Sequence, residues 1–176
     1  MRLDRRQILM VLSLVAITAL SRLVPHPPNF VPVGAIALAA GATLGPRWLA
    51  YALPLGGMLL ADAALGPHRQ MALVYAALAA MVWLGVRLGT NPRPLFVAGA
   101  AVSGSTLFFA VTNLGVWALD GLYPPTVEGL FECYVAALPF YGNSLLADLL
   151  YAGVLFAGLR WLGRQQRPGL AAVSPR

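Results

Sequence analysis

Two aspartates lie inside long apolar stretches, and they are the residues best placed to do chemistry in this sequence. Asp62 ends the segment LPLGGMLLAD, and Asp148 ends the segment LPFYGNSLLAD. A carboxylate inside a lipid bilayer is costly, so such residues usually bind a ligand, relay a proton or bridge neighbouring helices. For both aspartates the sequence leaves a ligand-binding role and a helix-bridging role open.

The two aspartate segments also resemble each other. Each has a Leu-Pro pair followed by Leu-Leu-Ala-Asp, with one extra residue between proline and aspartate in the second copy. Such similarity is typical of the internal repeats of transporters. Chance similarity in a chain rich in leucine and alanine is the alternative, and the sequence does not decide between them.

The composition indicates what must position these carboxylates. The chain has 176 residues, of which 59% are hydrophobic and only 10% are charged, whereas soluble domains average about 25% charged residues. We therefore expect an integral membrane protein of the all-α class, a compact bundle of six transmembrane helices. A single domain is expected over residues 1–165, followed by a disordered cytoplasmic tail over 166–176.

Apolar segments bounded by proline, glycine and charged residues predict six spans, at residues 7–24, 33–45, 48–65, 70–88, 95–119 and 144–163. The stretch 120–143 is interrupted by proline and glycine, so it predicts a short amphipathic helix near the membrane surface. Small residues four apart predict close helix packing along one face of two spans. These residues are Ala37, Gly41 and Gly45 in one span, and Ala72, Ala76 and Ala80 in the other.

The arginines predict the orientation. All twelve basic residues are arginines. With both termini in the cytoplasm, only Arg22 and Arg69 fall outside, which satisfies the positive-inside rule. The cytoplasmic set is Arg2, Arg5, Arg6, Arg47, Arg87, Arg93, Arg160, Arg164, Arg167 and Arg176. We expect a multi-pass protein of the bacterial inner membrane, and no nucleic-acid partner, because the arginines lie at helix ends.

Most other polar residues fall at the outer level of these spans. The candidate substrate-binding residues are His26, Asn29, Asp62, His68, Asn113, Asn143 and Asp148. The spans place both carboxylates at a similar depth, in a cup that opens outward above an apolar floor. We expect the cup to bind a small molecule; for Asn113, a hydrogen bond to a neighbouring helix is the alternative.

The segment RLVPHPPNFVPVGA, after the first span, is too stiff for an ordinary loop, because each proline fixes its own φ. It predicts a re-entrant or lid-like connector over the cup. Phe30 and Val31 should face the bundle, while His26 and Asn29 face a ligand. A purely structural corner is the alternative.

No cofactor or bound metal is expected. Cys133 is the single cysteine; a soft-metal or corrin-cobalt site with the two histidines is an alternative that matches no compact ligand spacing. Ser103 and Ser105 have no histidine near them, and neither a zinc-protease motif nor a phosphate loop occurs. We therefore expect a protein that is not an enzyme, and whose active transport needs an outside source of energy.

Four segments carry a family resemblance: RLVPHPPNFVPVGAIALAAGA, PLGGMLLADAALGPHRQMALVY, FFAVTNLGVWALDGLYPPT and CYVAALPFYGNSLLADLLYAGVLF. They resemble a bacterial membrane family described only as transport proteins, over about residues 22–156. More distantly, the layout is similar to the substrate-binding S-components of energy-coupling-factor (ECF) vitamin transporters. That likeness implies six helices, an outer site covered by the connector after the first helix, and an energising transmembrane and ATPase module as partner.

One feature departs from that pattern. S-components often carry alanines four apart in the first helix, where the coupling subunit docks, but here Ala16 and Ala19 are three apart. The function we expect is an S-component-like subunit that captures a small nutrient, such as a vitamin or its precursor. The alternatives are a stand-alone proton-coupled secondary transporter and a membrane scaffold or assembly protein that transports nothing.

Overall fold

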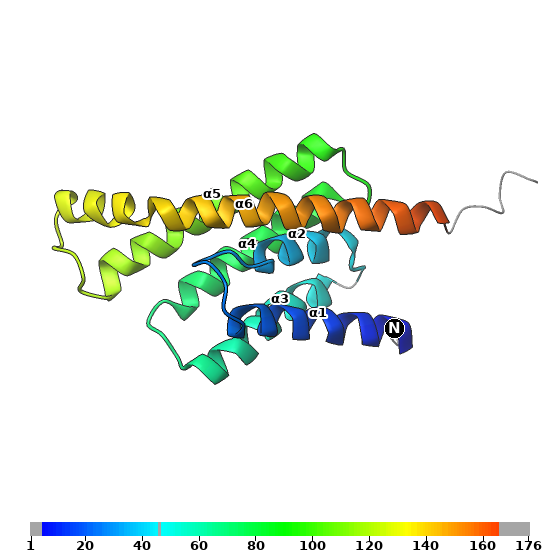
Figure 1. The fold of residues 1–176 in the computed structure, drawn as a ribbon, viewed down its shortest axis with the longest axis horizontal. Helices are drawn as coiled ribbons and strands as arrows, with labels where there is room; N and C mark the ends of the chain where they lie inside the picture. Colours follow the sequence, from blue (N-terminus) through cyan, green and yellow to red (C-terminus); the bar gives the residue numbers. More distant parts are fainter. Residues whose placement is uncertain (1–4, 46, 166–176) are drawn as a thin grey trace, which may run out of the picture.

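The structure, a computed structural model, describes the backbone of residues 5–45 and 47–165, and the side chains of 12–45 and 47–162. Within these residues the chain forms six helices and no strand, which confirms the all-α class. They are α1 (Arg5–Leu23), α2 (Val33–Thr43), α3 (Arg47–Leu65), α4 (Met71–Leu88), α5 (Pro94–Leu119) and α6 (Val127–Gln165). Successive helices run in alternating directions (Figure 1). The expected tail at 166–176 lies outside the described residues.

The short helix α2 lies at the centre of the bundle. Every residue from Val33 to Ala42 is buried, and α2 contacts each of the other five helices. A helix that is apolar or small on all sides is stable only when it is surrounded. The segment VGAIALAAGAT has that composition, so the longer helices pack around it.

The tightest packing joins α2 to α4 through two glycines. Gly41 lies against the backbone of Val82 and Val86, and Gly85 lies against the backbone of Leu38. The close contact predicted at Gly41 is therefore present, although Gly45 is exposed.

The small-residue face predicted for the fourth span is wrong. Ala72 and Ala76 are exposed and Ala80 is only half-buried, whereas the buried face of α4 carries Val74, Leu78 and Met81. Alanine spacing alone does not identify the contact face, because larger side chains also fill grooves between helices.

The prediction for residues 120–143 is also wrong. Instead of a short surface helix followed by a separate span, α6 is one continuous helix of 39 residues that contains Pro139. Proline removes one backbone hydrogen bond, but neighbouring groups in a membrane bundle can compensate for that loss, so proline is tolerated within the helix. At 1.5 Å per residue α6 is about 58 Å long, and together with α5 it extends beyond the other helices (Figure 1).

Length and composition indicate a membrane protein. Four helices, α3 to α6, are long and apolar enough to cross a membrane. Large apolar side chains such as Trp48, Leu95 and Val154 point outward. The six expected crossings are not established by these criteria, because α2 has 11 residues and spans about 16 Å of a hydrocarbon core about 30 Å thick.

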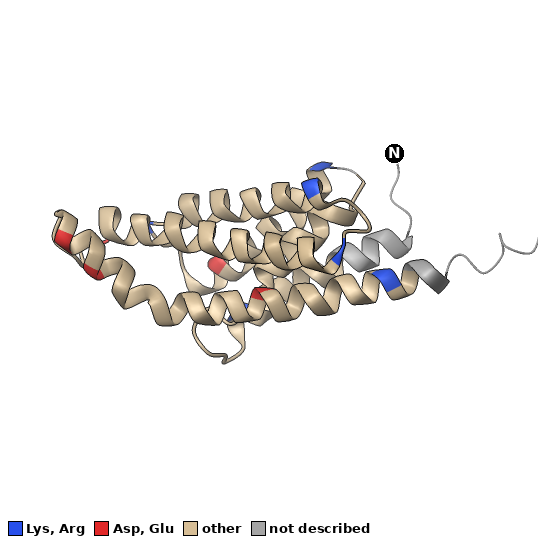
Figure 2. Cartoon of the chain, turned by 90° about the horizontal axis from the view of Figure 1, so that it is seen from above, with Lys and Arg blue, Asp and Glu red and all other residues tan. Residues whose placement is uncertain are grey.

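Charged residues separate along the bundle. Several basic positions lie near the end where α2 connects to α3 and α4 to α5, whereas acidic positions lie around the α5–α6 connection at the opposite end and also inside the bundle (Figure 2). We call the first the arginine end and the second the cavity end, because a cavity opens there. Arg47, in the first turn of α3, Arg87, in the last turn of α4, and Arg93, directly before α5, lie at the arginine end. This agrees with the arginine grouping, while the orientation in a membrane stays a prediction.

Candidate functional site

A cavity of about 540 Å³ opens at the cavity end of the bundle. The connector 24–32, α2, α4, α5 and α6 supply most of its wall, and α1 and α3 contribute Arg22 and Met58. Along α5 the wall runs from Ser105 to Val116, which corresponds to a depth of about 16 Å. Its volume and largely apolar lining match the usual dimensions of small-molecule sites.

Asp148 forms the deepest polar group of this cavity. The Ser105 hydroxyl donates a hydrogen bond of 2.6 Å to Asp148 Oδ2, and the side chains of both residues are buried. The backbone N–H of Ala35 also lies close to this carboxylate. Ala35 lies in the first turn of α2, so the carboxylate also faces the positive end of that helix. Helix end, hydroxyl and carboxylate together make a polar floor.

The sequence predicted that the two aspartates lie at a similar depth, and that prediction is wrong. Asp62 contacts Tyr75, whereas Asp148 and Met81 meet at Gly34. Tyr75 and Met81 are six residues apart on α4, or about 9 Å along the helix axis. The error arose because α6 begins at Val127 rather than at Ser144, so Asp148 lies near the middle of its helix.

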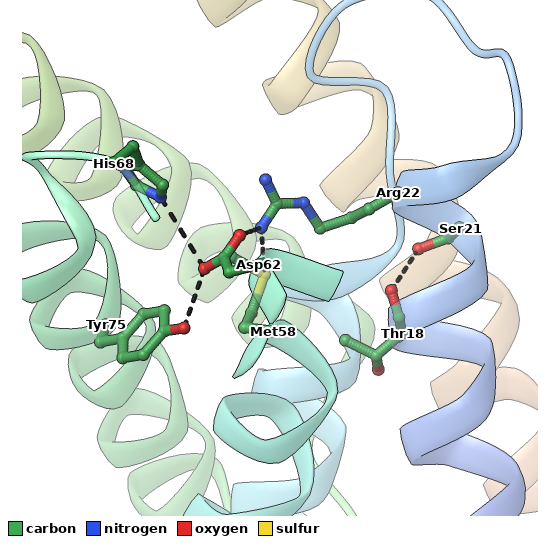
Figure 3. Close-up of polar contacts among 7 residues, drawn as sticks. All are labelled: Thr18, Ser21, Arg22, Met58, Asp62, His68 and Tyr75. Atoms are coloured by element: carbon green, nitrogen blue, oxygen red, sulfur yellow. Dashed lines mark hydrogen bonds and ion pairs between the residues drawn. The ribbon is translucent and has the colours of Figure 1, made fainter. Parts of the chain in front are cut away.

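Asp62 is enclosed by partners on three sides (Figure 3). Arg22 Nη1 donates to Asp62 Oδ1 at 2.8 Å, and the Tyr75 hydroxyl donates to Oδ2 at 2.8 Å. His68 Nε2 lies 3.7 Å from Oδ2. The same Arg22 nitrogen also contacts the sulfur of Met58. This cluster joins the end of α1 to α3 and α4, so Asp62 bridges helices and does not line the cavity.

The connector 24–32 lies at the mouth of the cavity. Phe30 packs against Tyr151 with 5.9 Å between ring centroids, and Val31 packs on the core. Both therefore face the bundle, as predicted. Asn29, with a φ of 61°, is the third residue of a four-residue turn in which the Phe30 N–H donates to the Pro27 carbonyl. Asparagine tolerates this left-handed conformation better than most residues.

The cavity brings together four of the seven residues singled out in the sequence: Asn29, His68, Asn113 and Asp148. Asp62 is held in its ion pair, and Asn143 donates to the Pro28 carbonyl at 2.9 Å. His26 is exposed, and its Nδ1 donates to the Pro27 carbonyl. These three are not part of the wall.

Asn113 does not bond to a neighbouring helix through its amide N–H group. The Nδ2 atom donates to Phe109 O in the same helix. Its backbone carbonyl does cross to α6, where the Cys133 thiol donates to it over 3.4 Å. Among the described residues no group of three or more His, Cys, Asp or Glu side chains could hold a metal ion.

Sequence reasoning missed three kinds of residue in the site. Ser105 was considered only as a nucleophile, and its partner Asp148 is 43 positions away. Gly34 does not stand out within its helical segment, yet its missing side chain leaves space for the Asp148 carboxylate. The aromatic residues of the wall, Phe108, Phe109 and Tyr141, do not stand out in an apolar sequence. Their spacing could have identified them: Phe108 and Phe109 follow Ser105 by three and four residues, and Tyr141 precedes Asp148 by seven, which places them on the same helix faces.

Gly34→Ala should disturb the floor of the cavity. A Cβ at this position would lie 2.6 Å from Met81 Cε and 2.8 Å from Asp148 Oδ2, so both side chains must move. We expect a loss of about 2 kcal/mol in unfolding free energy, the usual cost of overpacking, measured by SDS titration in mixed micelles. Gly153→Ala is the control, because a Cβ at Gly153 meets nothing within 4 Å. Equal stability of the two variants would contradict this placement of Asp148.

Comparison with known proteins gives a family but no function. No curated protein and no solved structure matches the chain significantly. One described family, whose function is unknown, matches residues 2–170, nearly the entire chain. The protein therefore belongs to the family of unknown function DUF6580.

Proposed function

We propose that the protein is a membrane transport protein whose cavity captures a small nutrient from the outer side of the bacterial inner membrane. The observation that carries this proposal is the cavity of about 540 Å³, open at one end and bounded below by a buried carboxylate and a helix N-terminus. A passive structural bundle has no need of such a space, because helix interfaces normally pack to high density.

The proposal includes six crossings, with both termini in the cytoplasm. The short helix α2 would complete one crossing together with the connector 24–32. Irregular backbone at membrane depth is tolerated where it is buried in protein or lines a water-filled cavity, and Asn29 and Val31 line the cavity. Half-length helices whose N-termini point at a central site are a recurrent device of transporters. The arginine end would then face the cytoplasm.

The energy source separates two versions of the proposal. In the S-component-like version a partner ATPase module drives uptake. In the second version the protein is a stand-alone proton-coupled carrier, which is favoured by one observation: within the described residues Asp148 is buried without any ion-pair partner. A buried acid of this kind is a natural proton carrier.

Native mass spectrometry of protein purified gently from its own membranes tests the capture function. We expect a bound small molecule, and we expect Ala136→Phe to remove it, because Ala136 lines the cavity and the ring would occupy that space. Ala118→Phe is the matched control, since Ala118 is exposed on α5 and is not part of the wall. A wild-type protein that carries only a protein partner would favour a scaffold, and one that is empty and alone would favour a weakly binding, gradient-driven carrier.

Uptake of the small molecule found by native mass spectrometry then separates the two energy sources. It is measured in proteoliposomes whose membrane contains the purified protein alone. Uptake that follows an imposed proton gradient and collapses with a protonophore indicates the stand-alone carrier. Uptake that appears only when an ATPase module is added indicates the S-component-like subunit.

A further inference from the structure

We propose that the cavity selects a singly charged organic cation with an apolar body, whose charge is balanced by Asp148. This inference rests on the proposed capture function and names the substrate class of the same site. It follows from a difference between the two buried carboxylates, from the position of Asp148, and from the kind of side chain that surrounds it.

The buried carboxylates differ in their partners. Asp62 has a guanidinium at 2.8 Å, so its charge is balanced within the protein. Asp148 accepts a hydrogen bond from the uncharged Ser105 hydroxyl and lies close to the Ala35 amide, and no arginine or histidine of the described chain pairs with it. Neutral donors stabilise an anion without cancelling its charge. Asp148 therefore carries a negative charge in the cavity wall that no counter-ion of the described chain balances.

The position of Asp148 makes that charge available to a ligand. The carboxylate is part of the cavity wall although its residue is only 6% exposed. A cation that reaches the floor would meet it away from bulk water, where an ion pair is stronger than at a surface. Arg22, nearer the mouth, would not repel such a cation strongly, because its charge is already paired with Asp62.

The walls above Asp148 are aromatic. Phe108 and Phe109 lie one turn along α5 from Ser105, and Tyr141 lies on α6 two turns from Asp148. All three line the cavity, and the rings of Phe109 and Tyr141 have centroids 4.8 Å apart. Aromatic faces attract organic cations and pack against apolar groups. A bare metal ion would instead need several oxygen ligands, and apart from Asp148 the nearby groups are mostly carbon.

The test uses 2-phenylethylammonium as the probe and 2-phenylethanol as its uncharged analogue of similar shape. Binding to the purified full chain in detergent is measured by isothermal titration calorimetry. We expect the ammonium to bind the wild type about tenfold more tightly than the alcohol, as a charge-assisted contact next to aromatic rings implies. In Asp148→Asn this preference should fall to about twofold or less. Glu132→Gln is the control for the loss of one negative charge on the same helix, because Glu132 is exposed, and it should keep the full preference.

A second variant leaves the carboxylate in place. Ser144 lines the cavity one helical turn before Asp148, so Ser144→Lys would supply an internal ammonium to that carboxylate. We expect it to weaken 2-phenylethylammonium binding by about tenfold while binding of 2-phenylethanol changes much less.

Either of two results would overturn the cation assignment: equal binding of ammonium and alcohol by the wild type, or an ammonium preference that survives both Asp148→Asn and Ser144→Lys. The capture function can stand without this assignment, if native mass spectrometry finds an uncharged or anionic molecule that Ala136→Phe removes. Conversely, selective ammonium binding without uptake of any cation would support the site and contradict transport.

Discussion

Asp62→Asn should destabilise the folded protein far more than Asp148→Asn, although the two substitutions are chemically identical and both sites are buried. Asp62 has 2% of its surface exposed and Asp148 6%, so burial does not distinguish them. Their partners do. Removing the charge of Asp62 leaves Arg22 without its counter-ion at the end of α1, whereas removing that of Asp148 leaves no unpaired cation among the described residues.

The expected magnitudes follow from that difference. Losing one member of a buried ion pair typically costs about 3 kcal/mol or more, because the remaining charge is desolvated. The Arg22 side chain is 24% exposed, so we expect the smaller loss of about 2–3 kcal/mol for Asp62→Asn. For Asp148→Asn we expect a change of about 1 kcal/mol, since the amide oxygen can still accept the Ser105 hydrogen bond. The unfolding free energy is measured for each variant by SDS titration in mixed micelles, with far-UV circular dichroism as the signal.

The double variant Arg22→Gln/Asp62→Asn provides the control. If the loss in Asp62→Asn comes from an uncompensated guanidinium, removing the guanidinium as well should restore at least half of the stability. Comparable losses in Asp62→Asn and Asp148→Asn, or no recovery in the double variant, would mean that the ion pair does not hold α1 to α3 as the contacts suggest.

The sequence was sufficient to find the two carboxylates, but not to assign their roles. Both stand out because charges are rare in the apolar segments of this chain, and that signal is local. Their roles depend on Arg22, which is 40 positions from Asp62, and on Ser105, which is 43 positions from Asp148. No periodicity or spacing within one segment contains information about such partners.

The helices show the same division between local and tertiary information. Most boundaries were predictable, because Pro46, Pro67 and the TNP turn at 90–92 terminate apolar stretches. The interruption at Pro139 was misleading, since the expectation that proline ends a helix holds for helices in water. The central position of α2 was not predicted either. Small and apolar residues occur on all sides of α2, and this composition is compatible with any close helix packing. Only the assembled bundle shows that five helices surround it.

Gly85→Leu should prevent the bundle from assembling, and Gly85→Ala should weaken it severely. A Cβ at Gly85 would overlap the backbone carbonyl of Leu38 on α2, and a Cβ at Gly41 would overlap that of Val82 on α4. Backbone atoms cannot move aside as the end of a flexible side chain can, so the two helices would have to separate. Because α2 contacts all other helices, separation at this point disturbs the whole core.

For Gly85→Ala we expect a loss of about 3 kcal/mol, at the upper end of overpacking costs, and for Gly85→Leu no monodisperse protein on size-exclusion chromatography in detergent. The matched control is Gly99→Ala in α5, where a Cβ meets nothing within 4 Å. There alanine should raise the unfolding free energy by about 0.5–1 kcal/mol, because glycine is unfavourable inside a helix. Opposite signs for the same substitution would locate the close contact at the α2–α4 interface. A Gly85→Ala variant as stable as the wild type would show that α2 and α4 are further apart than described, and that the cavity floor, which α2 supports, is placed incorrectly as well.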